Sequence, residues 1–238
     1  TFLGAHAVPP EYKGRSKAFL DFLLKEVMPV VKKENLAEFC DIFCEEGVFS
    51  VDESRQYLKK AREMGFKLKI HADEIVSLGG SELAGELKAT SADHLLHASD
   101  AGIKAMAENG VVSTLLPTTA FCLREPFARA REVIDAGCAV ALATDFNPGS
   151  GFTFSVPLML GLAVIYMHMT AEEAITALTL NGAAAVGRAD RIGSIEVGKQ
   201  ADLTILQYPS YKFLPYHTGV NIVEKVIKKG ELVHTASV

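Results

Sequence analysis

Two histidines and two carboxylates in this sequence follow apolar runs, an arrangement that suits metal-dependent hydrolysis. His71 and Glu74 come at the end of a run that alternates apolar and polar residues. His94 ends the next such run, and Asp145 follows a third. Enzymes built from βα units keep their catalytic groups at the carboxyl ends of strands, so we expect these side chains to share a site. A catalytic zinc ion takes about three protein ligands, and His71, His94 and Asp145 would supply them.

Each of these residues also has an ordinary structural interpretation. His71 and His94 would then be hydrogen-bonded structural residues. Glu74 would be a solvated loop residue or a helix cap, and Asp145 would cap a helix. We favour a functional interpretation because the residues recur at successive strand ends, and because a carboxylate such as Glu74 beside a metal-bound water can shuttle protons.

Further candidates for substrate binding lie at other strand ends. His6 follows the strand-like start of the chain and could hydrogen-bond a substrate or serve the structure alone. Asn147, Gly149 and Ser150 follow Asp145 and could offer amide and hydroxyl donors. Asn-Pro-Gly is also a common turn sequence, so a purely structural loop remains possible.

The four cysteines, Cys40, Cys44, Cys122 and Cys138, form no CxxC pair and lack the density of a disulfide scaffold. We expect reduced thiols. Alternation along one strand places Cys40 and Cys44 on a shared face, where a metal role is conceivable but buried packing is favoured. Reduced cysteines indicate a cytoplasmic location.

Composition indicates an ordinary globular protein with a small-molecule substrate. The 238 residues are 49% hydrophobic and 22% charged, with a net charge of −5. The lysines are dispersed along an acidic chain, which argues against nucleic-acid binding. The longest apolar stretch, 156–167, is shorter than the roughly 20 residues of a membrane helix, so we expect no membrane partner.

The order of elements predicts an α/β fold. Strands are expected to end near His6, Cys44, His71, His94, Leu116 and Asp145. Helical periodicity lies between them, over 18–24, 54–64, 83–87, 100–107 and 124–136. No GxGxxG fingerprint follows a strand, so a barrel is favoured over a nucleotide-binding sheet. Six βα units are recognisable, and we expect the other two units of a TIM-type (β/α)8 barrel to precede Thr1.

The sequence also predicts two domains. Residues 1–190 would form the partial barrel, including helices over 156–167 and 171–180. Residues 191–238 would form part of a small β domain made of two hairpins. The first hairpin would pair 193–198 with 201–206, and the second would pair 223–227 with 231–234 across Lys229-Gly230.

Five stretches resemble the amidohydrolase superfamily, and they are distributed over nearly the whole chain. They are Thr1 to Pro9, Lys67-Leu-Lys-Ile-His-Ala-Asp-Glu74, Ser91-Ala-Asp-His94, Ala141 to Ser150, and Gly193 to Asp202. The last is general to the superfamily. The first and fourth resemble the branch that hydrolyses the cyclic amide of an imidazolone ring during histidine degradation.

The resemblance implies a mononuclear site with one Zn²⁺ or Fe ion. His71 and Asp145 would be ligands, and a His-x-His pair would complete the set. The sequence contains no His-x-His, so we expect the pair upstream of Thr1. His94 would then lie beside the attacking water instead of binding the metal. Relatives that use a carbamylated lysine carry it on a strand that here ends in Cys44-Glu-Glu46.

The implied substrate is 4-imidazolone-5-propanoate and the implied product N-formimidoyl-glutamate. Glu74, His94 and Asp145 would be catalytic. Substrate contacts would come from His6, Glu74, Asn147, Gly149 and Ser150. A homodimer is expected. Two alternatives remain, a cytosine- or guanine-type aminohydrolase of the same superfamily, and a catalytically silent barrel segment that lacks half of its ligands.

Overall fold

The computed structural model describes residues 1–236, which divide into two compact units. The first unit comprises Thr1–Ser113 and Asp135–Ala139. The second comprises Thr114–Ile134 and the residues from Val140 onward. The domain boundary that the sequence predicts near residue 190 stays a prediction.

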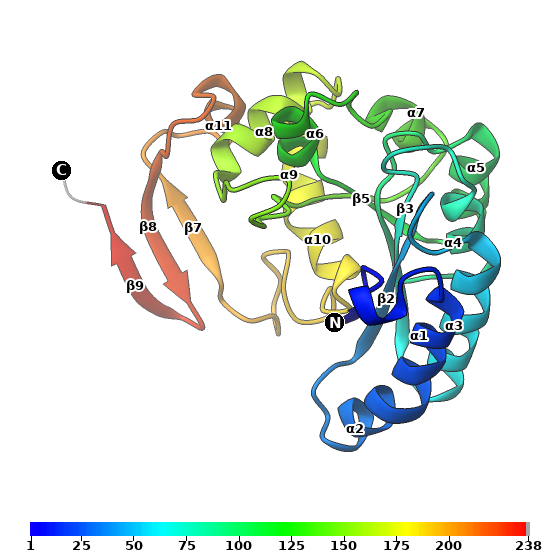
Figure 1. Cartoon of the computed structure of the whole chain (residues 1–238). Helices are drawn as coiled ribbons and strands as arrows, with labels where there is room; N and C mark the ends of the chain where they lie inside the picture. Colours follow the sequence, from blue (N-terminus) through cyan, green and yellow to red (C-terminus); the bar gives the residue numbers. More distant parts are fainter. Residues whose placement is uncertain (237–238) are drawn as a thin grey trace. The chain divides into compact units, whose positions relative to one another are not determined.

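A six-stranded sheet runs in chain order from β1 to β6 (Figure 1). Its strands are β1 (Phe2–Ala5), β2 (Phe39–Cys44), β3 (Lys67–Ala72), β4 (Ser91–His94), β5 (Val112–Leu115) and β6 (Val140–Leu142). Strands β1 to β4 pair in parallel, each with the next along the chain. Parallel neighbours joined by helices are the βα units expected from the sequence, and the predicted α/β fold class is confirmed.

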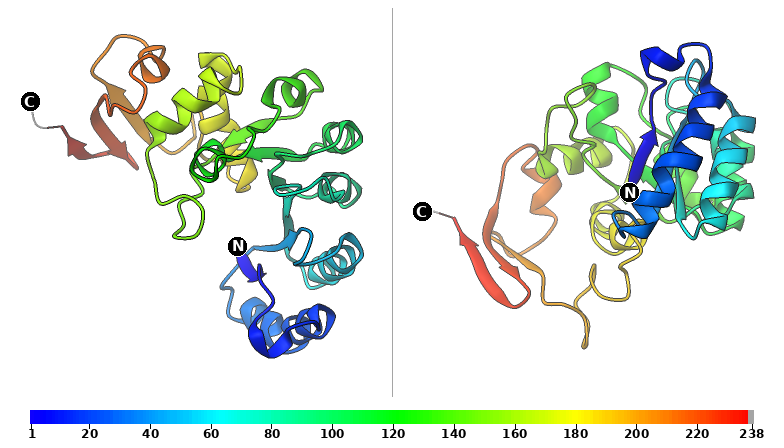
Figure 2. Two further views of the ribbon diagram at one scale, coloured as in Figure 1. Left: turned by 45° about the horizontal axis from the view of Figure 1, so that its top comes forward. Right: turned by 60° about the horizontal axis from the view of Figure 1, so that its bottom comes forward.

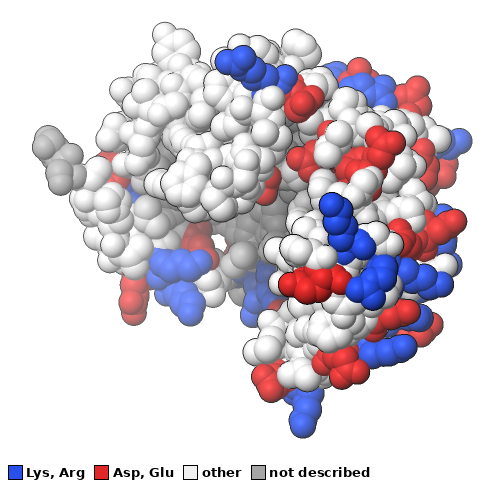
Figure 3. Space-filling view, viewed as in Figure 1, with Lys and Arg blue, Asp and Glu red and all other residues white. Residues whose placement is uncertain are grey.

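Helices of the first unit cover the sheet on one side (Figure 2). They are η1 (Pro10–Tyr12), α1 (Ser16–Phe22), η2 (Leu23–Val27), α2 (Met28–Lys33), α3 (Val51–Glu63), α4 (Gly80–Glu86) and α5 (Asp100–Glu108). Helix α3 shows why these segments are helical. Ser50 and Glu53 form a reciprocal capping box at its start, and Tyr57, Leu58 and Ala61 bury one face. The outer side of this layer of helices carries interspersed charges of both signs (Figure 3).

Helices α4 and α5 approach closely because each carries a glycine at the contact. A Cβ on Gly85 would lie 2.7 Å from the backbone of Ala105, and a Cβ on Gly102 would lie 2.0 Å from Ser81 Oγ. Neither distance leaves room for a methyl group. The packing that supports the β3–β4 region therefore depends on these two glycines.

We predict that Gly85→Ala lowers the free energy of unfolding by about 1–3 kcal/mol, because overpacking forces backbone shifts. Urea unfolding of the full-length protein measures the change. Gly182→Ala is the matched control: it also lies within a helix, and its added Cβ would meet only an ordinary contact of 3.4 Å. An equal loss in both variants would contradict the close-packing argument.

The second unit combines helices with a small antiparallel sheet. Its helical segments are α6 (Pro117–Leu123), α7 (Ala130–Asp135, whose last residue belongs to the first unit), α8 (Val156–Ile165), α9 (Ala171–Leu178), α10 (Leu180–Ala185) and α11 (Phe213–Tyr216). Strands β7 (Leu203–Leu206), β8 (Val223–Lys228) and β9 (Glu231–Thr235) follow in that order. The β8–β9 hairpin turns at Lys229-Gly230, as the sequence predicts. Both turn residues have positive φ.

Two sequence predictions are wrong in detail. Residues 193–198 form no strand, and β7 pairs with β8 instead. Gly193 has a φ of +95° and packs against the Thr179–Leu180 backbone, which extended geometry would prevent. The helix expected over 124–136 is confined to α7, because Arg124 ends α6 in the left-handed region and Pro126 disfavours helical geometry before it.

Candidate functional site

Strand register brings polar side chains of three strands to one face of the sheet. Phe43 of β2 pairs with His71 of β3, and His71 pairs with Asp93 of β4. Because side chains alternate along a strand, Asp41 lies on the same face as Phe43, whereas Ile42 lies on the opposite face and is fully buried. This face is polar at its centre, and the opposite face forms the apolar core.

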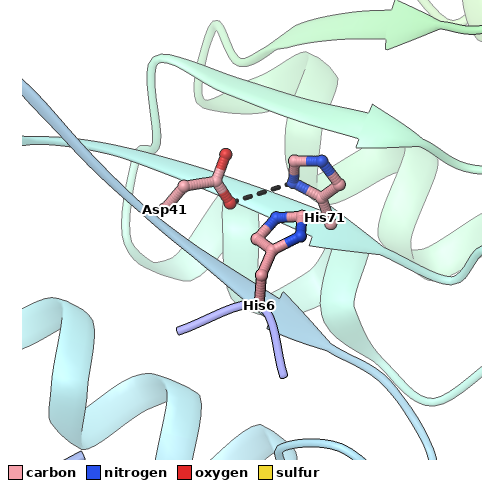
Figure 4. A group of neighbouring side chains, drawn as sticks. All are labelled: His6, Asp41 and His71. Carbon is pink, nitrogen blue, oxygen red and sulfur yellow. Dashed lines mark hydrogen bonds and ion pairs between the residues drawn. The ribbon is translucent and has the colours of Figure 1, made fainter. Parts of the chain in front are cut away.

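His6, Asp41 and His71 form a compact group in the first unit (Figure 4). One potential ligand atom from each lies within 4.8 Å of the others. The His6 and His71 rings meet edge to face with centroids 4.2 Å apart. Asp41 is buried, with a side chain that is 2% exposed, and His71 is 14% exposed. Imidazole nitrogens and carboxylates are donors that zinc takes in proteins, so a metal ion could bind beside this group with His71 as a ligand.

The hydrogen bond between Asp41 and His71 fixes which ring nitrogen can bind a metal. His71 Nδ1 lies 3.0 Å from Asp41 Oδ1. A carboxylate can only accept a hydrogen bond, so Nδ1 must carry the proton. The lone pair of a neutral His71 ring is therefore on Nε2. Metal-binding histidines commonly donate their other ring N–H to a carboxylate in this way.

Glu74 and His94 form a second pair beside His71. Glu74 Oε2 lies 3.4 Å from His94 Nε2, and the His94 ring lies 5.2 Å from the His71 ring. Burial, together with the nearby His71 and His6 rings, lowers the pKa of His94 to about 3, so this ring is neutral near pH 7. Its Nδ1 is buried and has no hydrogen-bond partner among residues 1–236. The pair can hold or pass a single proton.

Asp73 holds the loop that follows β3. Its two carboxylate oxygens accept four backbone N–H groups, from Leu78 to Ser81, and the Ser81 hydroxyl. Asp73 itself has a φ of +50°. A carboxylate with five donors serves the loop, and Asp73 is a structural residue.

Lys69, Ser91 and Asp93 form a hydrogen-bonded chain on the same face. Lys69 Nζ donates to Ser91 Oγ at 2.6 Å, and Ser91 Oγ donates to Asp93 Oδ1 at 2.9 Å. Burial raises the pKa of Asp93, while Lys69 and His71 act in the opposite direction. Lys69 thus supplies a positive charge that offsets the buried acids of this face.

Asp145 belongs to the second unit, as do Asn147, Gly149 and Ser150. Asp145 comes three residues after β6, and its Oδ2 accepts a hydrogen bond of 2.8 Å from Thr119 Oγ1. The Asn147 carboxamide accepts from the Gly149 and Ser150 N–H groups and donates to Ser150 Oγ. The structural interpretation of this Asn-Pro-Gly turn is therefore supported, and its role in substrate binding stays a prediction.

The sequence analysis missed Asp41. Its signal was a lone carboxylate inside the otherwise apolar run Phe39 to Cys44, where an isolated buried charge is costly and needs a partner. The cysteines of that run behave as expected. Cys40 and Cys44 are buried free thiols, and burial raises their pKa values to about 12 and about 11.

Comparison with known proteins decides the family. The sequence matches the amidohydrolase family over residues 41–233. The chain belongs to the amidohydrolase family. This amidohydrolase is 69% identical over 237 residues to an imidazolonepropionase of Clostridium tetani, and 64% identical over 232 residues to one of Parabacteroides distasonis. The matches cover 100% and 98% of the chain but only 57% and 56% of these relatives. The chain thus spans little more than half of their length.

Solved structures support the amidohydrolase fold. A zinc-bound adenosine deaminase of Xanthomonas campestris matches with a TM-score of 0.71 at 22% identity, over 96% of this chain and 59% of its own. An atrazine chlorohydrolase of Arthrobacter aurescens complexed with zinc matches with a TM-score of 0.70 at 18% identity, over 90% and 55%. In the part of the chain described, no helix has the length and apolar character to cross a bilayer.

We predict that Asp41→Ala weakens zinc binding by the full-length protein about 10- to 100-fold, as loss of a partner to a ligating histidine commonly does. Asp41→Asn should have a smaller effect, because its carboxamide oxygen can still accept from His71 Nδ1. Competition with a chelator measures the affinity.

Asp21→Ala is the control, since Asp21 is a surface acid of the same unit with only a 4.0 Å contact to Lys60. Unchanged zinc affinity in Asp41→Ala would show that Asp41 does not act on His71.

Proposed function

We propose that this chain is the larger part of an imidazolonepropionase, which hydrolyses the cyclic amide of 4-imidazolone-5-propanoate to N-formimidoyl-glutamate in histidine degradation. The observation that carries the proposal is 69% identity over the whole chain to a relative of that name. The polar face of β2, β3 and β4 adds chemistry that suits a hydrolase. Because relatives are longer, the activity is assigned to the full-length protein.

The proposed metal is one zinc or iron ion. His71, through Nε2, and Asp145 would hold it, with a His-x-His pair from outside this chain. When bound, the ion would lower the pKa of water and polarise a carbonyl group. The zinc in two solved amidohydrolase-like structures supports zinc as the first metal to test.

Proton transfer is the part of the reaction that this chain's own residues can perform. Water adds to the ring carbonyl carbon, the C–N bond breaks, and one proton must reach the departing ring nitrogen. Asp145 would accept a proton from the attacking water. Glu74 and the neutral His94, 3.4 Å apart, would relay this same proton to the nitrogen, so that the water's hydroxyl ends on the carbon and its proton on the nitrogen.

Substrate binding would use His6, Glu74, Asn147, Gly149 and Ser150. His6 is half-buried and lies against His71, which supports a position beside the reacting ring. The propanoate group calls for a cation such as arginine, which we expect in the part of the protein outside this chain. A homodimer and a cytoplasmic location complete the proposal.

The substrate assay tests the function directly. We expect the full-length protein to remove the ultraviolet absorbance of 4-imidazolone-5-propanoate and to release no ammonia from cytosine or guanine. Ammonia release from a base, with imidazolone absorbance unchanged, would favour the aminohydrolase alternative. Metal analysis of the 238-residue chain by itself addresses the silent alternative, since stoichiometric zinc or iron on that chain would contradict it.

Removing either member of the proton-transfer pair should slow catalysis and spare the metal. We predict that Glu74→Gln and His94→Asn each lower kcat about 10²- to 10⁴-fold, the usual contribution of general acid–base catalysis. Steady-state kinetics with parallel metal analysis measures both effects. Glu63→Gln, which changes an exposed acid on α3 of the same unit, is a control for charge removal. Near wild-type kcat in Glu74→Gln would exclude Glu74 from proton transfer.

A further inference from the structure

We propose that Glu45 is a positioning residue that holds Glu74 in place for proton transfer. This inference rests on the proposed function, because it gives Glu74 its acid–base role. Glu45 itself contacts neither His71 nor His94 in any hydrogen bond among residues 1–236. Its effect on the reaction would therefore pass through the backbone of Glu74.

The geometry is a carboxylate that clamps a turn. Glu45 Oε2 accepts hydrogen bonds from the backbone N–H groups of Glu74, at 3.0 Å, and Ile75, at 2.9 Å. Glu45 Oε1 accepts from the N–H of Glu46 at 2.9 Å. Glu45 is 1% exposed, so these bonds are shielded from water. In such surroundings each charge-assisted bond is stronger than at the surface.

The clamp is itself fixed to the sheet. Glu45 directly follows β2, its N–H donates to the carbonyl of Phe49, and its carbonyl accepts from the N–H of Val48. Phe49 is fully buried. The Glu45 backbone is thus part of a tight turn anchored in the core, and a side chain on such an anchor can transmit its position to a neighbouring loop.

The side chain of Ile75 adds little packing to the turn that carries Glu74, because it is 59% exposed. The Glu74 side chain is 14% exposed, and its Oε2 lies 3.4 Å from His94 Nε2. Asp73 fixes the later part of the loop, from Leu78 to Ser81. The earlier part of the loop is held by Glu45, whose carboxylate accepts from the backbone N–H groups of Glu74 and Ile75. Displacing a catalytic group by about 1 Å can cost about 10²-fold in rate, so this clamp bears on catalysis.

The chemistry of the clamp requires a carboxylate. Both oxygens of Glu45 face N–H donors, Glu46 on one side and Glu74 with Ile75 on the other. A glutamine can turn its oxygen to only one side, and its NH₂ group would then face another donor. Glu45→Gln must therefore lose part of the clamp, and Glu45→Ala loses all of it.

The test uses Glu45→Ala and Glu45→Gln in the zinc-loaded full-length protein, with Glu46→Gln as the matched control. Glu46 is the adjacent carboxylate, and it is exposed. We expect kcat on 4-imidazolone-5-propanoate to fall about 10- to 100-fold in Glu45→Ala and less in Glu45→Gln. Zinc content and the kcat of Glu46→Gln should stay within about twofold of wild type, whereas KM of Glu45→Ala should rise, because Glu74 also contacts the substrate in the proposed function. A wild-type kcat in Glu45→Ala would overturn the proposal.

A double-mutant cycle separates positioning from general destabilisation. In a Glu74→Gln background, Glu45→Ala should lower kcat by less than about threefold, because residues that act as a unit are not additive. The same fold-loss in both backgrounds would overturn the proposal. Glu45→Gln keeps the cycle usable if Glu45→Ala does not fold.

Hydrogen exchange gives a readout that does not depend on the substrate. The amides of Glu74 and Ile75 should exchange at least tenfold faster in Glu45→Ala than in Glu46→Gln. Wild-type protein that leaves 4-imidazolone-5-propanoate intact would refute the proposed function, and these exchange rates would still decide whether Glu45 holds the turn. Unchanged exchange at both amides would overturn the clamp.

Discussion

A carboxylate buried beside a parallel sheet must find hydrogen-bond donors, and two such groups, Asp41 within strand β2 and Glu45 directly after it, lie next to β3. Asp41 finds the ring N–H of His71, and Glu45 finds the backbone N–H groups of Glu74 and Ile75. Leaving either charge unpaired would cost several kcal/mol. The register of β2 on β3, with Phe43 opposite His71, is what brings these donors within reach. The arrangement of the polar face depends on this pairing.

Hydrogen bonding and burial also stabilise left-handed backbone conformations at the ends of β3 and β4. Asp73, His94 and Leu95 all have positive φ values. Such conformations cost roughly 1–3 kcal/mol each in non-glycine residues and persist only where surrounding contacts fix them. Five hydrogen bonds to the Asp73 carboxylate fix the turn after β3. The burial of His94 and Leu95 fixes the turn after β4. The strained turns aim Glu74 and His94 at each other.

The sequence predicts much of the fold and several site residues, because polar residues that directly follow alternating or apolar runs mark the ends of strands. His71, Glu74 and His94 each follow an alternating or apolar run, and the structure places all three together in the first unit. Asp41 and Glu45 were beyond prediction, because their roles depend on which strand lies beside β2 and in which register. Tertiary contacts also determine the conformation of residues 193–198. Gly193 packs against α10, and the expected strand does not form. The relation of Asp145 to His71 stays a prediction from the family resemblance.

Anomalous diffraction from crystals of the zinc-loaded full-length protein would test most directly whether Asp41 and Glu45 orient the site without binding the metal. We expect zinc on His71 Nε2, with Asp41 Oδ1 still about 3.0 Å from Nδ1 and Glu45 still bonded to the Glu74 amide. Zinc coordinated by Asp41, or a His71 ring turned away from it, would contradict the account.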